Sequence, residues 1–366
     1  MKKILATLLT FVMVFALTAC AGGGGTAPAA PAPAPAPAPA ADGGTTPAPA
    51  PEAPADTAQA PEIIMRLAEI HSADFPTTLG NFEFARLVNE RTNGRIQIDV
   101  FPGGQLGDET AVVQELVMGT IEFARVSVSP ATGFSPGLNA IMLPFIYRDS
   151  DHMWAVLNGP IGQQLLDEVA RESASLVGLA WYDAGARHFY THTHQLFTMD
   201  DFEGLRFRMQ DAPLMQGIVT ALGGSPISMG MGEVYQALAT GLVEGAENNI
   251  PSYESWSHYE VAPYFLLTGH SRVPEILMAS MQVMDRLSAE DQAIIRQSAE
   301  DASLYQRQRW IEREEYSLNI VRQNPDVVIT EVPPEEWQRF ADAVQHLHVE
   351  FGAGHEDLIQ QIINTN

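Results

Sequence analysis

The chain has 366 residues, a formal net charge of −25 at pH 7 and a single cysteine. This length allows two lobes or domains, each with a core of its own, and the apolar content is that of an ordinary globular protein. The strong negative charge argues against nucleic-acid binding, because binding phosphates needs a basic face, and one cysteine excludes a disulfide framework.

The N-terminus has the pattern of an export signal. Lys2 and Lys3 precede an apolar run, residues 4–17, that is too short to span a membrane comfortably. Cys20 follows directly, and the Leu-Thr-Ala-Cys sequence that it ends resembles the lipobox of bacterial lipoproteins. We therefore expect residues 1–19 to be a lipoprotein signal peptide and Cys20 to be lipidated. An unlipidated export signal with an incidental cysteine is the alternative.

Residues 20–61 are rich in glycine, proline and alanine. Such a composition cannot bury enough apolar surface to offset the entropy of ordering, and its prolines favour the extended polyproline II conformation. We expect a disordered tether here, between the lipid anchor and the folded part of the chain.

The folded part begins near residue 62 with a first α/β unit. Strands and helices are expected to alternate as β-α-β-α-β over residues 63–70, 81–91, 96–100, 108–117 and 121–128. Asp108 is the expected N-cap of the second helix. This order favours a parallel sheet covered by helices.

A second α/β unit follows, with strands or helices expected at 188–192, 205–209, 213–222, 226–229, 233–240 and 243–249. Residues 288–324 then contain no proline and form one long predicted helix. Ser288 and Asp291 resemble a capping box at its start. Because this helix is longer than ordinary globular helices, we expect it to run along both units.

The sequence contains no G-x-S-x-G, H-E-x-x-H or P-loop motif, and the Gly-Met-Gly sequence at 230–232 lacks the third glycine of a dinucleotide-binding loop. His188, His192 and His194 cluster, but no carboxylate or cysteine stands beside them at ligand spacing. Ordinary histidines on a polar hairpin are therefore favoured over a metal site. We expect neither an enzyme nor a bound metal or cofactor.

Two arginines lie in surroundings that suit anion binding. Arg187 occurs in Gly-Ala-Arg-His, and Arg208 lies between Phe207 and Met209 in an expected strand. A guanidinium can hold a carboxylate through two parallel hydrogen bonds, which lysine cannot do. Surface salt bridges in this acidic protein are the alternative, and spacing alone does not decide between the two.

Six short sequences together carry a family resemblance. They are TNGRI at 92–96, FPGGQLG at 101–107, LPF at 143–145, DFEGLRFR at 201–208, EVYQAL at 233–238 and GAENN at 245–249. In this order they resemble the extracytoplasmic solute-binding proteins of tripartite ATP-independent periplasmic (TRAP) transporters, the DctP-like group, over nearly all of residues 62–366.

The resemblance implies an α/β, two-lobed periplasmic-binding-protein-like fold, with a ligand cleft between the lobes and a long helix spanning both. It implies a lobe I of residues 62–184 plus 274–313 and a lobe II of residues 185–273 plus 314–366.

The resemblance also implies a set of ligand-binding residues. Arg208 matches the family's main carboxylate clamp, Arg187 the arginine that assists it, and Asn248 an asparagine that lines the ligand. Positions that match family elements less specifically are Asn249, Glu233, Tyr235, Glu69, His71, Met231 and Ser127. The side-chain amides of Asn248 and Asn249 would suit a polyhydroxylated ligand, because an amide both donates and accepts.

Residues 185–190 and 247–253 look most like the branch that binds hexuronates such as glucuronate or galacturonate. Ile250 and His188 depart from that branch, which usually has tryptophan and serine there. The resemblance implies an extracytoplasmic protein that hands a small organic acid to membrane subunits for ion-gradient-driven uptake, and the lipobox adds the expectation that it is lipid-anchored. A C4-dicarboxylate, keto acid or aromatic acid as ligand, a surface sugar-acid enzyme, and a ligand sensor for a receptor remain alternatives.

Overall fold

The computed structural model describes residues 60–366. The predicted signal peptide, Cys20 and nearly all of the tether lie outside the described residues and stay predictions. No helix within the described part combines the length and apolar character needed to cross a membrane.

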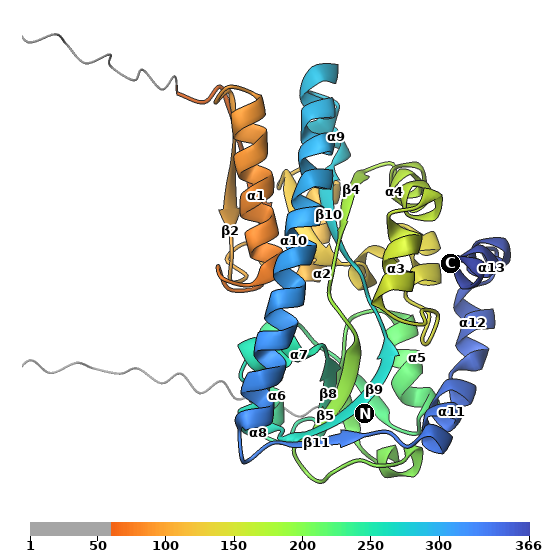
Figure 1. Cartoon of the computed structure of the whole chain (residues 1–366). Helices are drawn as coiled ribbons and strands as arrows, with labels where there is room; N and C mark the ends of the chain where they lie inside the picture. Colours follow the sequence, from red (N-terminus) through yellow and green to blue (C-terminus); the bar gives the residue numbers. More distant parts are fainter. Residues whose placement is uncertain (1–59) are drawn as a thin grey trace, which may run out of the picture. The chain divides into compact units, whose positions relative to one another are not determined.

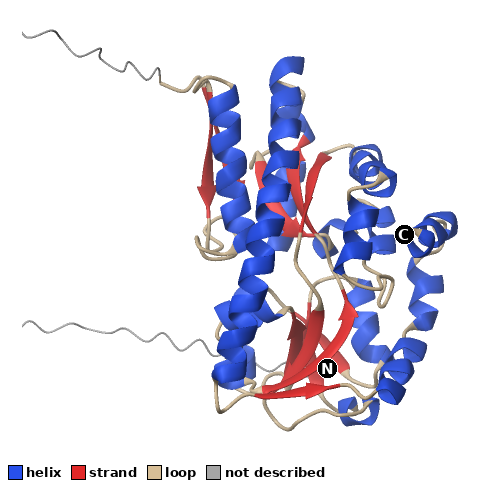
Figure 2. Cartoon of the chain, in the orientation of Figure 1, coloured by secondary structure: helices blue, strands red, loops and turns tan. Residues whose placement is uncertain are grey.

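The first sheet has five strands in the spatial order β2-β1-β3-β10-β4 (Figures 1 and 2). They are β1 (Ile63–Ala68), β2 (Ile96–Phe101), β3 (Phe123–Ser127), β4 (Leu176–Tyr182) and β10 (Glu275–Ser280). β1 pairs in parallel with β2 and β3, as the strand-helix alternation predicts. The whole sheet is nevertheless mixed, because β10, which lies outside that predicted unit, pairs antiparallel with β3 and β4. The chain returns there directly from the second sheet, without the crossover helix that a parallel strand would need.

The second sheet has six strands in the order β11-β9-β5-β8-β6-β7. They are β5 (Arg187–Thr191), β6 (Arg206–Met209), β7 (Ser225–Ser228), β8 (Gly245–Asn248), β9 (Tyr264–Ser271) and β11 (Val328–Glu331). β5 is antiparallel to β8 and β9, whereas β6 is parallel to β7 and β8. Two short links join the sheets, one from β4 to β5 and one from β9 to β10.

Helices cover both sheets (Figure 2). The α-helices are α1 (Pro76–Arg91), α2 (Glu109–Met118), α3 (Ser150–Leu157), α4 (Pro160–Ser173), α5 (Pro213–Ala221), α6 (Val234–Ala239), α7 (Ile250–Ser255), α8 (His258–Val261), α9 (Met281–Met284), α10 (Ala289–Gln323), α11 (Pro334–Ala343), α12 (Gln345–Phe351) and α13 (Glu356–Asn364). Short 3₁₀ segments are η1 (Ser129–Ala131), η2 (Pro136–Ile141), η3 (Met199–Phe202) and η4 (Met231–Glu233).

The long predicted helix is α10. Ser288 caps it, because its Oγ accepts the N–H of Asp291 at 3.1 Å and donates to the Asp291 carboxylate at 2.8 Å. α10 packs against α1 and β4 of the first sheet and against α7 beside the second, so it runs along both (Figure 1). Midway along it, the buried Gln306 side chain bonds both the N–H and the carbonyl of Asp183, in the link after β4.

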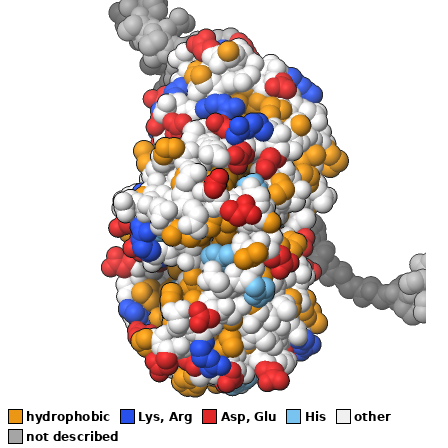
Figure 3. Space-filling model, turned by 90° about the vertical axis from the view of Figure 1, so that its right-hand side faces the viewer, with side chains coloured by type: hydrophobic (Ala, Val, Ile, Leu, Met, Phe, Trp, Pro, Cys, Tyr) orange, Lys and Arg blue, Asp and Glu red, His pale blue; other side chains and the backbone are white. Residues whose placement is uncertain are grey.

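The C-terminal helices lie against elements of both sheets. α11 contacts β9 and α12 contacts α5, but α13 contacts α4 and η2. The assignment of residues 314–366 to lobe II stays a prediction. The face of the molecule in Figure 3 carries acidic side chains scattered among apolar and uncharged ones, in keeping with the negative net charge.

Each sheet has an apolar core that fixes its strands. Under the first sheet, Leu67 and Phe123 pack with Ile295 of α10. In the second, Phe207 on β6 packs edge-on against Phe189 on β5 of the same sheet. Since successive strand residues point to opposite faces, burying Phe207 turns its neighbour Arg208 to the other face of β6. That face borders the cavity described next.

Candidate functional site

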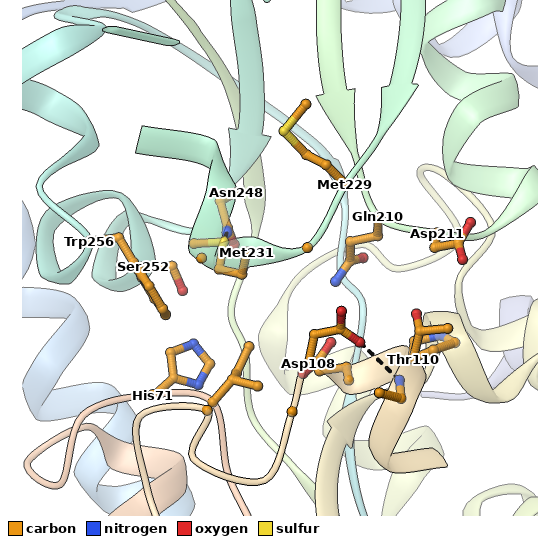
Figure 4. Close-up of a pocket in the computed structure, with 18 of the residues that line it drawn as sticks. His71, Asp108, Thr110, Gln210, Asp211, Met229, Met231, Asn248, Ser252 and Trp256 are labelled. Atoms are coloured by element: carbon orange, nitrogen blue, oxygen red, sulfur yellow. Dashed lines mark hydrogen bonds between the residues drawn. The ribbon is translucent and has the colours of Figure 1, made fainter. Parts of the chain in front are cut away.

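A cavity of about 650 Å³ is lined by segments of both sheets. In Figure 4, His71, Asp108 and Thr110 enter it from segments of the first sheet, and Gln210, Met231, Asn248, Ser252 and Trp256 face them from segments of the second. Four of the lining side chains are acidic: Asp108, Glu109, Asp211 and Glu275. The lining arginines are Arg187 and Arg208.

Arg208 is a buried cation without an anionic partner. Its side chain is on β6, the residue is 5% exposed, and Nε and Nη2 both donate to the carbonyl oxygen of Met229, at 3.0 and 2.8 Å. Within residues 60–366 no carboxylate forms an ion pair with it, and Nη1 has no hydrogen-bond partner. Burial lowers the pKa of Arg208 from its ordinary value, although nearby Glu247 partly offsets this. A buried guanidinium without a counter-charge favours the binding of an anion.

Arg187 lies beside Arg208 but is already paired. It stands on β5 opposite the antiparallel strand β8, and its Nη2 donates to Oε1 of Glu247 at 2.7 Å, while Nε donates to Oε2. Burial alone would lower the pKa of Arg187, but the Glu247 carboxylate raises it. Glu247 therefore satisfies one edge of this guanidinium, and Nη1 is the nitrogen left without a partner in the described chain.

Asn248 and Asn249 follow Glu247 at the end of β8. The Asn248 amide nitrogen contacts the sulfur of Met231 at 3.6 Å, and its oxygen accepts the N–H of Asn249 at 2.9 Å. Asn249 is the N-cap of α7, because its side-chain oxygen accepts the N–H of Ser252 at 2.7 Å. Both residues line the cavity, although some of their polar groups already form hydrogen bonds within the protein.

The floor of the cavity is a cluster of carboxylates around one fully buried arginine, Arg125 of β3. Glu69, directly after β1, accepts hydrogen bonds from Nε and Nη2 of Arg125. Glu109 of α2 and Glu275 of β10 both accept from Nη1 of the same arginine. Burial would lower the pKa of Arg125, but the three carboxylates raise it well above its ordinary value. This cation is thus saturated and is not open to a ligand.

A glycine-rich loop brings backbone to the cavity wall. Gly103 and Gly104 have φ of 72° and 70°, in the left-handed region that favours glycine. Their N–H groups bond the carbonyls of His71 and Glu69, at 2.7 and 2.9 Å. These bonds tie the loop to the end of β1 and place Asp108 as the N-cap of α2, where it accepts the N–H of Ala111 at 2.9 Å (Figure 4).

The structure brings six of the predicted site residues into the cavity lining: Arg208, Arg187, Asn248, Asn249, His71 and Met231. Two more lie directly behind the lining. Glu69 bonds Arg125, and Ser127 bonds both Glu109 and Gln210, at 2.6 and 2.9 Å.

Glu233 and Tyr235 lie outside the lining. The Glu233 carboxylate accepts the N–H of Gly230 at 3.2 Å and so shapes the start of η4. The Tyr235 hydroxyl donates to Glu260 at 3.2 Å on the exposed side of α6. Both residues thus support the local fold.

Sequence reasoning missed several lining side chains, among them Asp108, Glu109, Gln210, Asp211, Ser252, Trp256 and Glu275. Asp108 and Glu109 directly follow the glycine-rich loop, so their place in the sequence could have identified them as lining residues. No sequence pattern could have identified Glu275, because its position depends on the antiparallel insertion of β10. His188, predicted as an ordinary histidine, accepts the N–H of Gly269 at 3.0 Å, and burial lowers its pKa to about 3.

Known protein families and solved structures share this architecture. The model of the family described as "Bacterial extracellular solute-binding protein, family 7" (DctP) matches residues 67–354. The fold is similar to that of a TRAP periplasmic solute-binding protein from Bradyrhizobium sp. BTAi1 in complex with D-galacturonate. The two are 39% identical, with a TM-score of 0.80, over 82% of this chain and 99% of the other.

Two further solved structures are similar. The TRAP periplasmic solute-binding protein of Chromohalobacter salexigens, with bound D-glucuronate, is 35% identical over 82% of this chain and all of its own, with a TM-score of 0.78. The protein from Sulfurospirillum deleyianum, with bound succinate, is 27% identical over 84% of this chain and all of its own, also with a TM-score of 0.78.

Proposed function

This chain belongs to the DctP family of bacterial extracellular solute-binding proteins, family 7, and we propose that the solute it captures is a hexuronate such as D-glucuronate or D-galacturonate. It has the mixed α/β, two-sheet periplasmic-binding-protein-like fold of the family. It is an extracytoplasmic solute-binding protein of a TRAP transporter and not an enzyme.

The observation that carries the proposal is the unpaired guanidinium of Arg208 in the cavity. A carboxylate placed against Nη1 would supply the missing counter-charge in a water-poor site, where charge-assisted hydrogen bonds are strong. Arg187 would contribute its own Nη1 from β5, which is separated from β6 by β8, and Asn248 its remaining amide hydrogen.

The remaining lining favours a ligand with one carboxylate and many hydroxyls. Arg187 is paired with Glu247, so within residues 60–366 the lining offers one guanidinium without a carboxylate partner, Arg208, and a second carboxylate of a dicarboxylate would find no further arginine in that state. Hydroxyl groups can instead donate to Asp108, Glu109 and Asp211, which would repel a second carboxylate. Trp256 adds an aromatic face to the cavity. Bound glucuronate and galacturonate in the similar structures support the same choice.

We further propose that the two sheets belong to two lobes that close on the ligand, with residues 62–184 plus 274–313 in lobe I and most of the remainder in lobe II. Asn248 and Arg208 come from one lobe, whereas His71 and Asp108 come from the other. Contacts that form only when both sides reach the ligand would shift the population toward the closed state.

Anchoring by a lipid at Cys20 is likewise a proposal, and it rests on the sequence before residue 60. Together with the proline-rich tether it would hold the folded part near the membrane subunits that accept the solute. We expect the N-terminal peptide of the mature protein to begin at Cys20 and to carry acyl chains, which mass spectrometry can detect. A mature chain that begins elsewhere, or an unmodified thiol at Cys20, would contradict the anchor.

Thermal unfolding with a panel of acids tests the ligand class. D-glucuronate or D-galacturonate at 100 times its Kd should stabilise the protein by about 2.7 kcal/mol, which raises Tm by several degrees. D-glucose, which has the hydroxyls without the carboxylate, serves as the matched control and should have no effect. A larger shift with succinate or a keto acid than with either hexuronate would replace the ligand proposed here with that acid.

A further inference from the structure

The carboxylate cluster at the cavity floor holds more negative charge than its arginine can neutralise. Glu69, Glu109 and Glu275 surround the single cation Arg125. Glu69 faces Arg125 edge to edge, in the two-bond geometry that neutralises a guanidinium most completely. Glu109 and Glu275 are left to share one nitrogen, Nη1, so two carboxylates converge on one donor group.

The hydrogen bonds distinguish the two members of this pair. Glu109 accepts from Arg125 at 2.9 Å, from the Ser127 hydroxyl at 2.6 Å and from the Ser127 N–H at 3.0 Å. Three hydrogen-bond donors thus converge on the Glu109 carboxylate. Glu275 accepts only from Arg125 within the described chain, is 6% exposed, and lines the cavity. A proton shared by the pair therefore belongs on Glu275.

From this geometry we propose that Glu275 is the carboxyl group of this cluster that carries a proton in a fraction of the free molecules near neutral pH, and that binding an anionic ligand increases that fraction. The protonated group also offers the ligand a hydrogen-bond donor on an otherwise acidic wall. This inference rests on the proposed function in one respect, namely that the ligand is an anion.

The charged groups around Glu275 support this assignment. Burial is the main cause that raises the pKa of Glu275, to about 7. The charge of Arg125 lowers this pKa, whereas the nearby carboxylates of Glu109 and Glu69 raise it further. The groups that face it are Arg125 on β3, Glu109 on α2, Glu69 after β1, Arg187 on β5 and Tyr182, its register partner on β4. His71, bonded to Glu69, has its pKa lowered by burial and by Arg125, so it adds no positive charge near neutral pH.

The proposal predicts the direction in which pH changes the affinity for the ligand. A ligand that adds negative charge to the cavity stabilises the protonated form, so its binding takes up protons when the solution is above about pH 7. Affinity should then fall as pH rises beyond that point, by at most about tenfold per pH unit.

Calorimetric titration with D-galacturonate at pH 7.5, in two buffers of different ionisation enthalpy, measures this uptake. The parent protein should take up a fraction of one proton per ligand bound. Glu275→Gln, which keeps the shape and neutral charge of the protonated group, should take up close to none and bind with little dependence on pH. Glu331→Gln, at an exposed glutamate of β11, is the matched control and should behave like the parent.

A ligand-free measurement separates this inference from the proposed function. Because the folded pKa of Glu275 lies above the unfolded one, the parent should lose stability relative to Glu275→Gln as pH rises from about 4.5 to about 7, with no further change above that. Galacturonate binding without proton uptake, or a variant whose Tm stays parallel to the parent's over this range, overturns the inference. If no hexuronate binds, the ligand proposal fails, and the Tm comparison still decides whether Glu275 carries the proton.

Discussion

Arg208→Ala should bind its acid about 2–5 kcal/mol more weakly than the parent, or roughly 30- to 4,000-fold. The substitution removes the one lining guanidinium that has no carboxylate partner in the described chain. A ligand carboxylate would then be left in a buried site without a counter-charge. Isothermal titration with the hexuronate identified in the thermal panel measures the loss.

Two matched variants sharpen this experiment. Arg206→Ala, two residues earlier on the same strand, removes an arginine that is half-exposed and paired with Glu244, so its affinity should stay near the parent's. Arg208→Lys keeps the charge but loses the planar pair of donors, so it should recover only part of the affinity. Equal affinities for the parent and Arg208→Ala would show that the carboxylate binds elsewhere.

Arg125→Met should destabilise the folded protein by about 3–5 kcal/mol at pH 8, because it leaves buried carboxylates without their cation. Three glutamates depend on this one side chain, which is fully buried. Burial alone would raise the pKa of Glu69, and the charge of Arg125 is the largest of the influences that lower it. Urea unfolding gives the free energy for both proteins.

The pH dependence of this loss of stability tests the same explanation. Burial raises the pKa of Glu69 and Glu275 once the opposing charge of Arg125 is removed. The variant can then fold with these groups protonated, so its deficit in stability should shrink as pH falls from 8 to 5. Arg66→Met is the control, since it breaks the half-exposed pair of Arg66 on β1 with Glu122, which precedes β3, and should cost at most about 1 kcal/mol. A deficit for Arg125→Met no larger than this control's would mean that the cluster does not need its cation.

Local signals predicted the elements that depend on local chemistry. The capping residues Ser288 and Asp108 were found where they were expected, because an N-cap bonds backbone only two or three residues away. Strand β6 was predicted from Phe207 and Met209 flanking an arginine, and the burial of both explains why Arg208 turns to the cavity. The family resemblance identified the positions at 187, 208, 248 and 249 that line the cavity.

Features that depend on distant segments were not predicted. The family resemblance placed residues 274–313 with the first unit, but no local pattern showed that β10 pairs antiparallel with β3, because the two strands lie far apart in the sequence. Arg125 is one charged residue in an apolar strand, and its role becomes visible only when Glu69, Glu109 and Glu275 come together around it. Glu233 carried a family match, yet it acts on the backbone of its own turn.

A crystal structure of the protein with D-galacturonate or D-glucuronate bound tests the central claim most directly. We expect the carboxylate of the sugar acid within hydrogen-bond distance of Nη1 of Arg208, and its hydroxyl groups toward Asp108, Glu109 and Glu275. A ligand whose carboxylate lies at the acidic wall, or outside this cavity, would contradict the assignment of Arg208 as the anion-binding group.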